Sequence, residues 1–149
     1  MVMIRPIGQT DRQDYLDMCR EFYSGDAVLH PVPEDYFERT FDTLMKSDTY
    51  ASAYIIEEAG EKAGYALLAK TWSQEAGGIV IWIEELYIRP KYQDRGYGTA
   101  FFRFLERELG DGVCRLRLEY EPDNLRGAAL YRRLGFEPLA YGQMVKELG

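Results

Sequence analysis

The spacing of hydrophobic residues divides the chain into short segments with two different periods. Alternating or continuous runs rich in β-branched and aromatic residues predict strands. Apolar residues three and four positions apart predict helices, and glycine and proline mark the loops between elements. The pattern predicts strands at 3–7, 51–58, 62–72, 79–88 and 113–120, helices at about 10–23, 33–45, 99–109 and 124–134, and one bent or two short strands at 136–148.

Local residues refine these elements. Residues 10–13 have the form of a capping box, and residues 59–61 predict a hairpin turn between two antiparallel strands. Gly64 marks a bulge or a close backbone approach. A helix joins strands 79–88 and 113–120, so we expect these strands to be parallel with a right-handed crossover. The prediction is one α/β domain over 1–149, with a mixed sheet and helices on both faces.

The stretch between strand 79–88 and the next helix is the first candidate for chemistry. It reads Gln93-Asp94-Arg95-Gly96-Tyr97-Gly98-Thr99. A helix start presents unpaired N–H groups and a partial positive charge, and glycines let an anion approach the backbone. A diphosphate site is one interpretation, and a tight steric turn is the other. The loop has neither the P-loop pattern nor a third glycine of the dinucleotide pattern.

Two blocks together resemble the GNAT superfamily of acyl-CoA N-acyltransferases. Residues 93–98 match the Gln/Arg-x-x-Gly-x-Gly/Ala pattern of that family, and residues 84–88 resemble its fourth strand. Residues 124–136 match a second block, Asn-x-x-Ala-x-x-x-Tyr-x-x-x-Gly-Phe, with Gly127 where alanine is usual. The resemblance implies a mixed, mostly antiparallel sheet of six or seven strands, with splayed parallel central strands and about four helices on both faces.

Composition and charge narrow the class of protein. With 149 residues, of which 46% are hydrophobic, the chain has the size of one domain. Its net charge of −7 argues against a nucleic-acid partner. Neither a run of about twenty apolar residues nor a secretory leader pattern is present, which predicts a cytoplasmic protein without a membrane anchor.

The residues that commonly bind metals or form disulfides are few. Cys19 and Cys114 are expected to be buried, reduced thiols, and His30 is expected to be a loop residue without a catalytic role. We therefore predict no metal. The basic residues gather around the two blocks, which suggests a basic rim for a polyanionic cofactor on an acidic body; they are Arg89, Lys91, Arg95, Arg103, Arg126, Arg132 and Arg133.

The family resemblance implies acetyl-CoA as the acyl-donor cosubstrate. The main chain of Leu86, Tyr87 and Ile88 would bind the pantetheine arm, because diverging strands leave unpaired backbone groups. A backbone N–H near Leu86 or Tyr87 would stabilise the oxyanion. The remaining residues implied to contact the cofactor are Gln93, Asp94, Arg95, Gly96, Tyr97, Gly98, Thr99, Asn124, Ala128 and Tyr131.

Three residues are candidates for catalysis. Tyr131 matches the general acid of the family, with packing against the cofactor as the alternative role. Glu84 and Glu85 are candidates for the base that deprotonates the amine. Glu84 is preferred, because polyamine acetyltransferases of this family carry a glutamate nine residues before the motif. Either carboxylate could instead hold the acceptor ammonium or pair with an arginine.

The resulting functional hypothesis is transfer of an acetyl group to a primary amine of a cationic small molecule by direct attack in a ternary complex. Acetylation of a peptide N-terminus or a lysine is the alternative within this class. A non-catalytic acyl-CoA sensor is the alternative from another class. A homodimer is also considered.

Overall fold

The computed structural model describes residues 1–25 and 30–149. Its strands are β1 (Val2–Pro6), β2 (Ala51–Glu58), β3 (Glu61–Ser73), β4 (Gly78–Ile88) and β5 (Val113–Leu118). Its α-helices are α1 (Arg12–Tyr23), α2 (Glu34–Lys46), α3 (Tyr97–Glu108) and α4 (Leu125–Arg133). Two short 3-10 helices are η1 (Gln9–Asp11) and η2 (Pro90–Tyr92).

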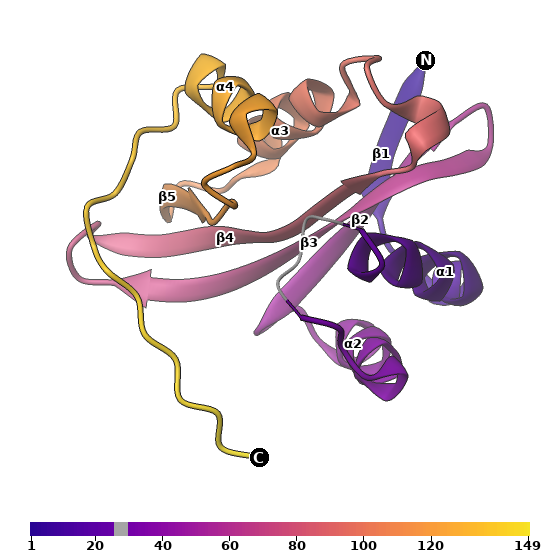
Figure 1. Ribbon diagram of the computed structural model, residues 1–149, viewed down its shortest axis with the longest axis horizontal. Helices are drawn as coiled ribbons and strands as arrows, with labels where there is room; N and C mark the ends of the chain where they lie inside the picture. The colour runs from indigo at the N-terminus through magenta and orange to yellow at the C-terminus, as the bar shows by residue number, and fades with distance from the viewer. Residues whose placement is uncertain (26–29) are drawn as a thin grey trace.

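The described strands form one mixed sheet in the order β1-β2-β3-β4-β5. The first four pair antiparallel, and β5 pairs parallel to β4, as the helical crossover predicted. Helices α1 and α2 lie on one side of the sheet, while α3 and α4 lie on the other (Figure 1). The prediction of an α/β sheet with helices on both faces is therefore confirmed.

Each face of the sheet has its own hydrophobic core because successive strand residues point to opposite faces. Ile55 and Tyr65 pack with α1 and α2, whereas their neighbours Ile56 and Ala66 pack with Phe101 and other residues of α3. The close approach predicted at Gly64 is also confirmed, since a Cβ there would lie 2.1 Å from the carbonyl oxygen of Tyr87. No larger residue fits between these strands.

The prediction of six or seven strands is wrong for the described residues, which form five. Residues 136–148, expected to form the last strands, carry no regular secondary structure. Pro138 lacks an N–H, and without a ladder partner the segment stays irregular. Figure 1 shows this C-terminal segment, in yellow, leaving α4 and ending clear of the helices and strands.

Three local predictions also need correction. The capping box at residues 10–13 does not form; instead the Asp11 carboxylate accepts hydrogen bonds from Gly8 N and from Arg5. Cys19 is buried as expected, but Cys114 is exposed, because β5 is an edge strand. Tyr36, one of the apolar positions from which the helix at about 33–45 was predicted to be buried on one face, is 43% exposed, while its neighbour Phe37 is buried.

Candidate active site

Strands β4 and β5 separate partway along their length. Their pairing runs from Ile79 opposite Val113 to Ile83 opposite Leu118 and then ends, although β4 continues to Ile88. Among the described residues, no strand pairs with residues 84–88 on the β5 side. The splay implied by the family resemblance is therefore present. Backbone groups at that edge are free to bind an extended, amide-bearing ligand.

A β-bulge marks the same point on the other side of β4. Glu85 lies opposite Leu67 and Ile83 lies opposite Leu68, so Glu84 is the extra residue. A bulge changes the alternation of side chains, so sequence parity alone could not orient the two glutamates. Both side chains line the same cavity.

The loop after β4 leads directly into the open end of α3. Gly96 precedes the helix with φ +78°, a left-handed conformation that disfavours any side chain. The first bond of the helix runs from Ala100 N to Gly96 O, so the N–H groups of residues 97–99 precede it. No side chain caps this end. The helix start can therefore donate hydrogen bonds to an anion, with a favourable dipole.

The side chains of this loop point to protein partners. Gln93 donates to the carbonyl of Ile88 at 2.9 Å, Arg95 pairs with Glu58 at 2.9 Å, and Asp94 pairs with Arg126. Tyr97 is buried in the core. Any contact of these residues with a diphosphate is accordingly a main-chain contact.

The predicted basic rim carries less free charge than its sequence suggested. Arg89 pairs with Glu21 and Lys91 pairs with Glu61, in addition to the two pairs of Arg95 and Arg126. Within residues 1–25 and 30–149, no ion pair involves the other three predicted rim residues, Arg103, Arg132 and Arg133. An incoming polyanion would meet a surface that is largely neutralised.

The second sequence block forms α4 and its cap. Asn124 Oδ1 accepts a hydrogen bond from Gly127 N at 2.9 Å and closes the helix N-terminus. A Cβ at residue 127 would lie 2.6 Å from Asn124 Nδ2, so the side chain of Asn124 would have to shift to admit alanine here. Ala128 is buried.

Tyr131 extends from α4 into an aromatic cluster. Its ring centroid lies 6.2 Å from that of Phe102, 6.0 Å from Phe136 and 5.9 Å from Tyr120. The side chain is half-buried and lines the cavity, and desolvation raises the pKa of its phenol. Tyr131 is thus a protonated donor at neutral pH.

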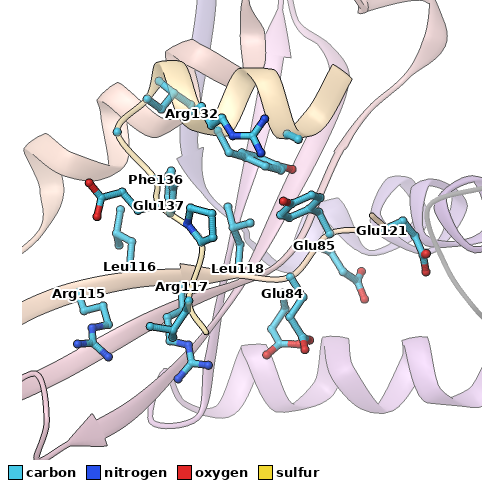
Figure 2. A pocket seen from close by; sticks show the side chains of 18 of the residues that line it. Glu84, Glu85, Arg115, Leu116, Arg117, Leu118, Glu121, Arg132, Phe136 and Glu137 are labelled. Carbon is cyan, nitrogen blue, oxygen red and sulfur yellow. The ribbon is translucent and has the colours of Figure 1, made fainter. Parts of the chain in front are cut away.

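A cavity of about 1060 Å³ brings together Glu84, Glu85 and Tyr131 from β4 and α4. Figure 2 shows Glu84, Glu85 and Glu121 toward one side of this cavity, and Arg115 and Arg117 toward the other. Arg115 pairs with Glu75 at 3.0 Å, and the Arg117 guanidinium lies 4.2 Å from the ring centroid of Trp82.

The two adjacent glutamates have different surroundings. Desolvation raises the pKa of Glu84, and the nearby carboxylates of Glu119 and Glu85 raise it further. Desolvation also raises the pKa of Glu85, but hydrogen bonds from Tyr23 and Tyr65 oppose this effect. Glu84 is exposed, and desolvation together with the nearby carboxylates favours its protonated form, whereas phenol donors favour the ionised form of Glu85.

Sequence reasoning missed Tyr23, Tyr65 and Glu119. Tyr23 ends α1 and Tyr65 lies on β3, so both reach Glu85 only through the tertiary fold. Glu119 follows β5 in the second arm of the splay. None of the three belongs to a sequence motif that could have identified it.

The described residues contain no group of three or more potential metal ligands, and no helix among them is long and apolar enough to cross a membrane. His30 is an exposed residue outside the helices and strands.

Both comparisons of the sequence with known proteins find acetyltransferases. The acetyltransferase (GNAT) family model matches residues 13–136. The chain is 25% identical over 153 residues to the thialysine N-epsilon-acetyltransferase of Mus musculus, covering 91% of this chain and 84% of that protein.

Solved structures are similar over nearly the whole chain. A possible acetyltransferase from Clostridium difficile 630 gives a TM-score of 0.84 at 16% identity, covering 99% of this chain and 98% of that one. AAC(6')-Iy in complex with the bisubstrate analog CoA-S-monomethyl-acetylneamine gives 0.82 at 16% identity, covering 100% and 99%. At these identities the structural likenesses establish the fold.

Proposed function

This chain belongs to the acetyltransferase (GNAT) family and is an acetyltransferase enzyme. We propose that it transfers the acetyl group of acetyl-CoA to a primary amine of a cationic small molecule. The observation that carries the proposal is the cavity that joins Glu84, Glu85 and Tyr131 at the point where β4 and β5 separate. The reaction is direct attack in a ternary complex.

Residues of β4 and of the following loop would hold acetyl-CoA. No described strand pairs with Leu86, Tyr87 and Ile88 on the β5 side, and this edge suits the amides of pantetheine, although the Ile88 carbonyl already accepts from Gln93. The N–H groups at the start of α3 suit the diphosphate. The bound thioester supplies an activated acetyl carbon. Asn124 and Ala128 would contribute through the N-terminal turn of α4, and Tyr131 would lie beside the sulfur.

The proposed chemistry uses three groups. Glu84 accepts a proton from the acceptor ammonium, directly or through water, and the neutral amine attacks the thioester carbonyl. A backbone N–H near Leu86 or Tyr87 stabilises the oxyanion. As the carbon–sulfur bond breaks, Tyr131 donates a proton to the departing thiolate, and the attacking nitrogen loses its extra proton, which returns to the Tyr131 phenolate directly or through water. The products are the amide and free coenzyme A, and the proton taken by Glu84 passes to solvent.

The charge of the cavity supports a cationic acceptor. Six carboxylates line it, from β4, α3, the chain after β5 and the chain after α4, against three arginines; the carboxylates are Glu84, Glu85, Glu106, Glu119, Glu121 and Glu137, and the arginines are Arg115, Arg117 and Arg132. The mouse relative is named for acetylating the side-chain amine of thialysine, which is also a small cationic amine. Acetylation of peptide N-termini or lysines is the alternative acceptor class, and an acyl-CoA sensor is the non-catalytic alternative.

The test is release of free thiol from acetyl-CoA over a panel of small amines and peptides, with product mass measured for each acceptor. Turnover on small diamines with none on peptides supports the proposal. Turnover on peptides alone supports the alternative acceptor class. Binding of acetyl-CoA without thiol release on any acceptor would support the sensor.

A homodimer is a further part of the proposal. The outer edge of β5 has no strand partner among the described residues, and the C-terminal segment has exposed apolar side chains at Leu139, Tyr141 and Met144. An open edge and an unpaired apolar segment are complementary surfaces for strand addition. A second copy of the chain would satisfy both.

A further inference from the structure

Glu85 is held by two phenols that come from different elements. Tyr23 at the end of α1 donates a hydrogen bond to Glu85 Oε2, and Tyr65 on β3 donates to Oε1 at 2.6 Å. Each carboxylate oxygen therefore has its own donor. Protonation of Glu85 would place a hydrogen on one of these oxygens and weaken one of the two bonds.

The two phenols are themselves fixed in place. The Tyr23 ring lies between Phe22, at a centroid distance of 5.1 Å, and Phe37, at 5.3 Å. Tyr65 is fully buried and packs against Tyr15 at 5.2 Å. This packing keeps both hydroxyl groups directed at Glu85.

In the part of the chain that the structure describes, no basic side chain pairs with Glu85. The titratable groups around it are Tyr15, Cys19 and Tyr23 of α1, Tyr65 of β3 and Glu84 of β4, none of which is basic. Among the described residues, no lysine or arginine forms an ion pair with Glu85, and residues 26–29 contain no basic side chain. A partly buried carboxylate without a cation is costly, unless a ligand supplies the positive charge.

Glu84 and Glu85 cannot usefully serve the same amine. A carboxylate that binds an ammonium stabilises its charged form, which opposes the deprotonation needed for attack. Glu84 has no phenol donor in the described structure, and it suits the base. Glu85 suits a cationic group that stays charged throughout the reaction.

We propose that Glu85, fixed by Tyr23 and Tyr65, binds a second ammonium group of the acceptor, so that the preferred substrates are diamines or diamino acids rather than monoamines. Tyr23 is a positioning residue in this arrangement, because it acts through Glu85. This inference rests on the proposed function, and it specifies the acceptor class.

The kinetic test compares 1,4-diaminobutane with n-butylamine, which differs by lacking the second ammonium. We expect wild-type kcat/KM to favour the diamine by about ten- to a hundredfold, in line with one ionic hydrogen bond. Glu85→Gln should bring this ratio close to one, through a larger loss of kcat/KM for the diamine than for n-butylamine. Tyr23→Phe should lower the ratio partly, through KM for the diamine, and Tyr36→Phe on the exposed face of α2 is the control. A preference that survives in Glu85→Gln would overturn the inference.

A second measurement does not depend on turnover. In protein labelled with carboxyl-¹³C glutamate, the Glu85 signal is assigned by its loss in Glu85→Gln, and its pKa is followed by NMR. Tyr23→Phe should raise this pKa by about half to one unit, because one donor to the ionised form is lost. An unchanged pKa would overturn the positioning role of Tyr23.

The same spectra separate this inference from the proposed function. If the wild-type protein acetylates no small amine of the panel, these two amines included, the proposed function fails. In that case the NMR signal of Glu85 tests the inference by itself. A change in its chemical shift on addition of 1,4-diaminobutane but not of n-butylamine supports the inference. Equal changes with both amines refute it.

Discussion

Tyr131 and Glu84 are two candidate catalytic side chains whose surroundings favour opposite proton roles. Burial keeps the phenol of Tyr131 protonated, whereas the base candidate Glu84 must be ionised to act. Its raised pKa makes Glu84 a stronger base than a solvated glutamate. Separate acid and base groups at one cavity are what acyl transfer to an amine requires.

Replacing Tyr131 with phenylalanine tests the acid role. We expect kcat to fall by about ten- to a thousandfold, because the thiolate would leave without a positioned proton donor. The ring packing is retained, so the affinity for acetyl-CoA should hardly change. Steady-state kinetics and calorimetric titration with coenzyme A measure both, with the exposed Tyr50→Phe as control. Full activity in Tyr131→Phe would exclude this residue as the acid.

The pH profile tests the base. Since the pKa of Glu84 is raised, kcat/KM should fall on the acid side at a pH above the ordinary range of a glutamate. Glu119→Gln removes a like charge near Glu84, lowers that pKa and should move this acid limb to lower pH. Glu147→Gln, in the exposed C-terminal segment, should leave the limb in place. If the acid limb lies at the same pH in Glu119→Gln as in the wild type, a group other than Glu84 titrates there.

For individual residues, the sequence identified the charged and aromatic candidates for the active site but not their hydrogen-bond partners. Glu84, Glu85 and Tyr131 stand out because they fall in or near motifs. The donors to Glu85 lie 62 and 20 residues away, so only the packing of α1 and β3 against β4 brings them together. The role of Gly127 likewise depends on how Asn124 folds over its helix.

The turn before α3 contains a glycine in the left-handed backbone conformation. Gly96 has φ +78° and Gly60, in the β2–β3 turn, has φ +81°, and neither has a heavy atom within 4 Å of an added Cβ. A side chain at either position is strained by the backbone alone. The two glycines differ in that only Gly96 adjoins the proposed diphosphate site.

This pair allows a matched test of the cofactor site. Gly96→Val and Gly60→Val should each lower the free energy of unfolding by about 1–2 kcal/mol, the cost of a left-handed non-glycine residue. Only Gly96→Val should also weaken coenzyme A binding, because the valine would displace the loop that precedes the donor N–H groups. Urea unfolding and calorimetric titration on the same samples measure both effects. Equal coenzyme A affinities in the two variants would argue against a diphosphate site at this turn.

The connection between β1 and α1 depends on one buried carboxylate. Asp11 is 1% exposed and accepts two hydrogen bonds of 2.8 Å from Arg5 and one of 2.7 Å from Gly8 N. Asp11→Ala should lower the free energy of unfolding by about 2 kcal/mol, since these charge-assisted bonds are lost. Asp35→Ala removes an exposed pair with Arg39 and should cost about 0.5 kcal/mol or less.

The same carboxylate makes a pH-dependent contribution to stability. Hydrogen bonds from Arg5 lower the pKa of Asp11 in the folded state. Its stabilisation is therefore complete above the unfolded pKa of about 3.9 and disappears as pH falls through the lower folded pKa. Urea unfolding from pH 7 to pH 3 should show a smaller loss of stability for Asp11→Ala than for the wild type. Parallel curves would show that another group dominates acid unfolding.

Elements with strong periodicity were predictable, and their ends were less so. The 3.6-residue period of α3 and the apolar runs of β2, β3 and β4 are local signals, and each appears within a few residues of its predicted range. The capping box predicted between Thr10 and Gln13 does not form, because residues 9–11 are a 3-10 helix whose Asp11 binds Arg5 of β1. Competition from a distant side chain is invisible in a four-residue motif.

At the scale of the molecule, the described residues form a five-stranded sheet between two helical layers. Only part of that arrangement follows from local patterns. The parallel pairing of β4 and β5 follows from the intervening helix, and the two cores follow from strand alternation. The strand count did not follow, because residues 136–148 have a strand-like composition but no partner. A strand exists only where another backbone completes its hydrogen bonds.

The missing partner leads to the last prediction, which concerns assembly. Val145 is 83% exposed and Leu148 is 90% exposed, and single chains rarely leave both an apolar segment and a sheet edge uncovered. We expect the wild-type protein to elute as a dimer of the 17.3 kDa chain in size-exclusion chromatography with light scattering. Val145→Lys should shift the population toward monomer by burying an unpaired charge in the interface. The control Lys46→Glu, at the exposed end of α2, should remain dimeric. A wild-type protein that is monomeric at all concentrations would show that the β5 edge stays unpaired in solution.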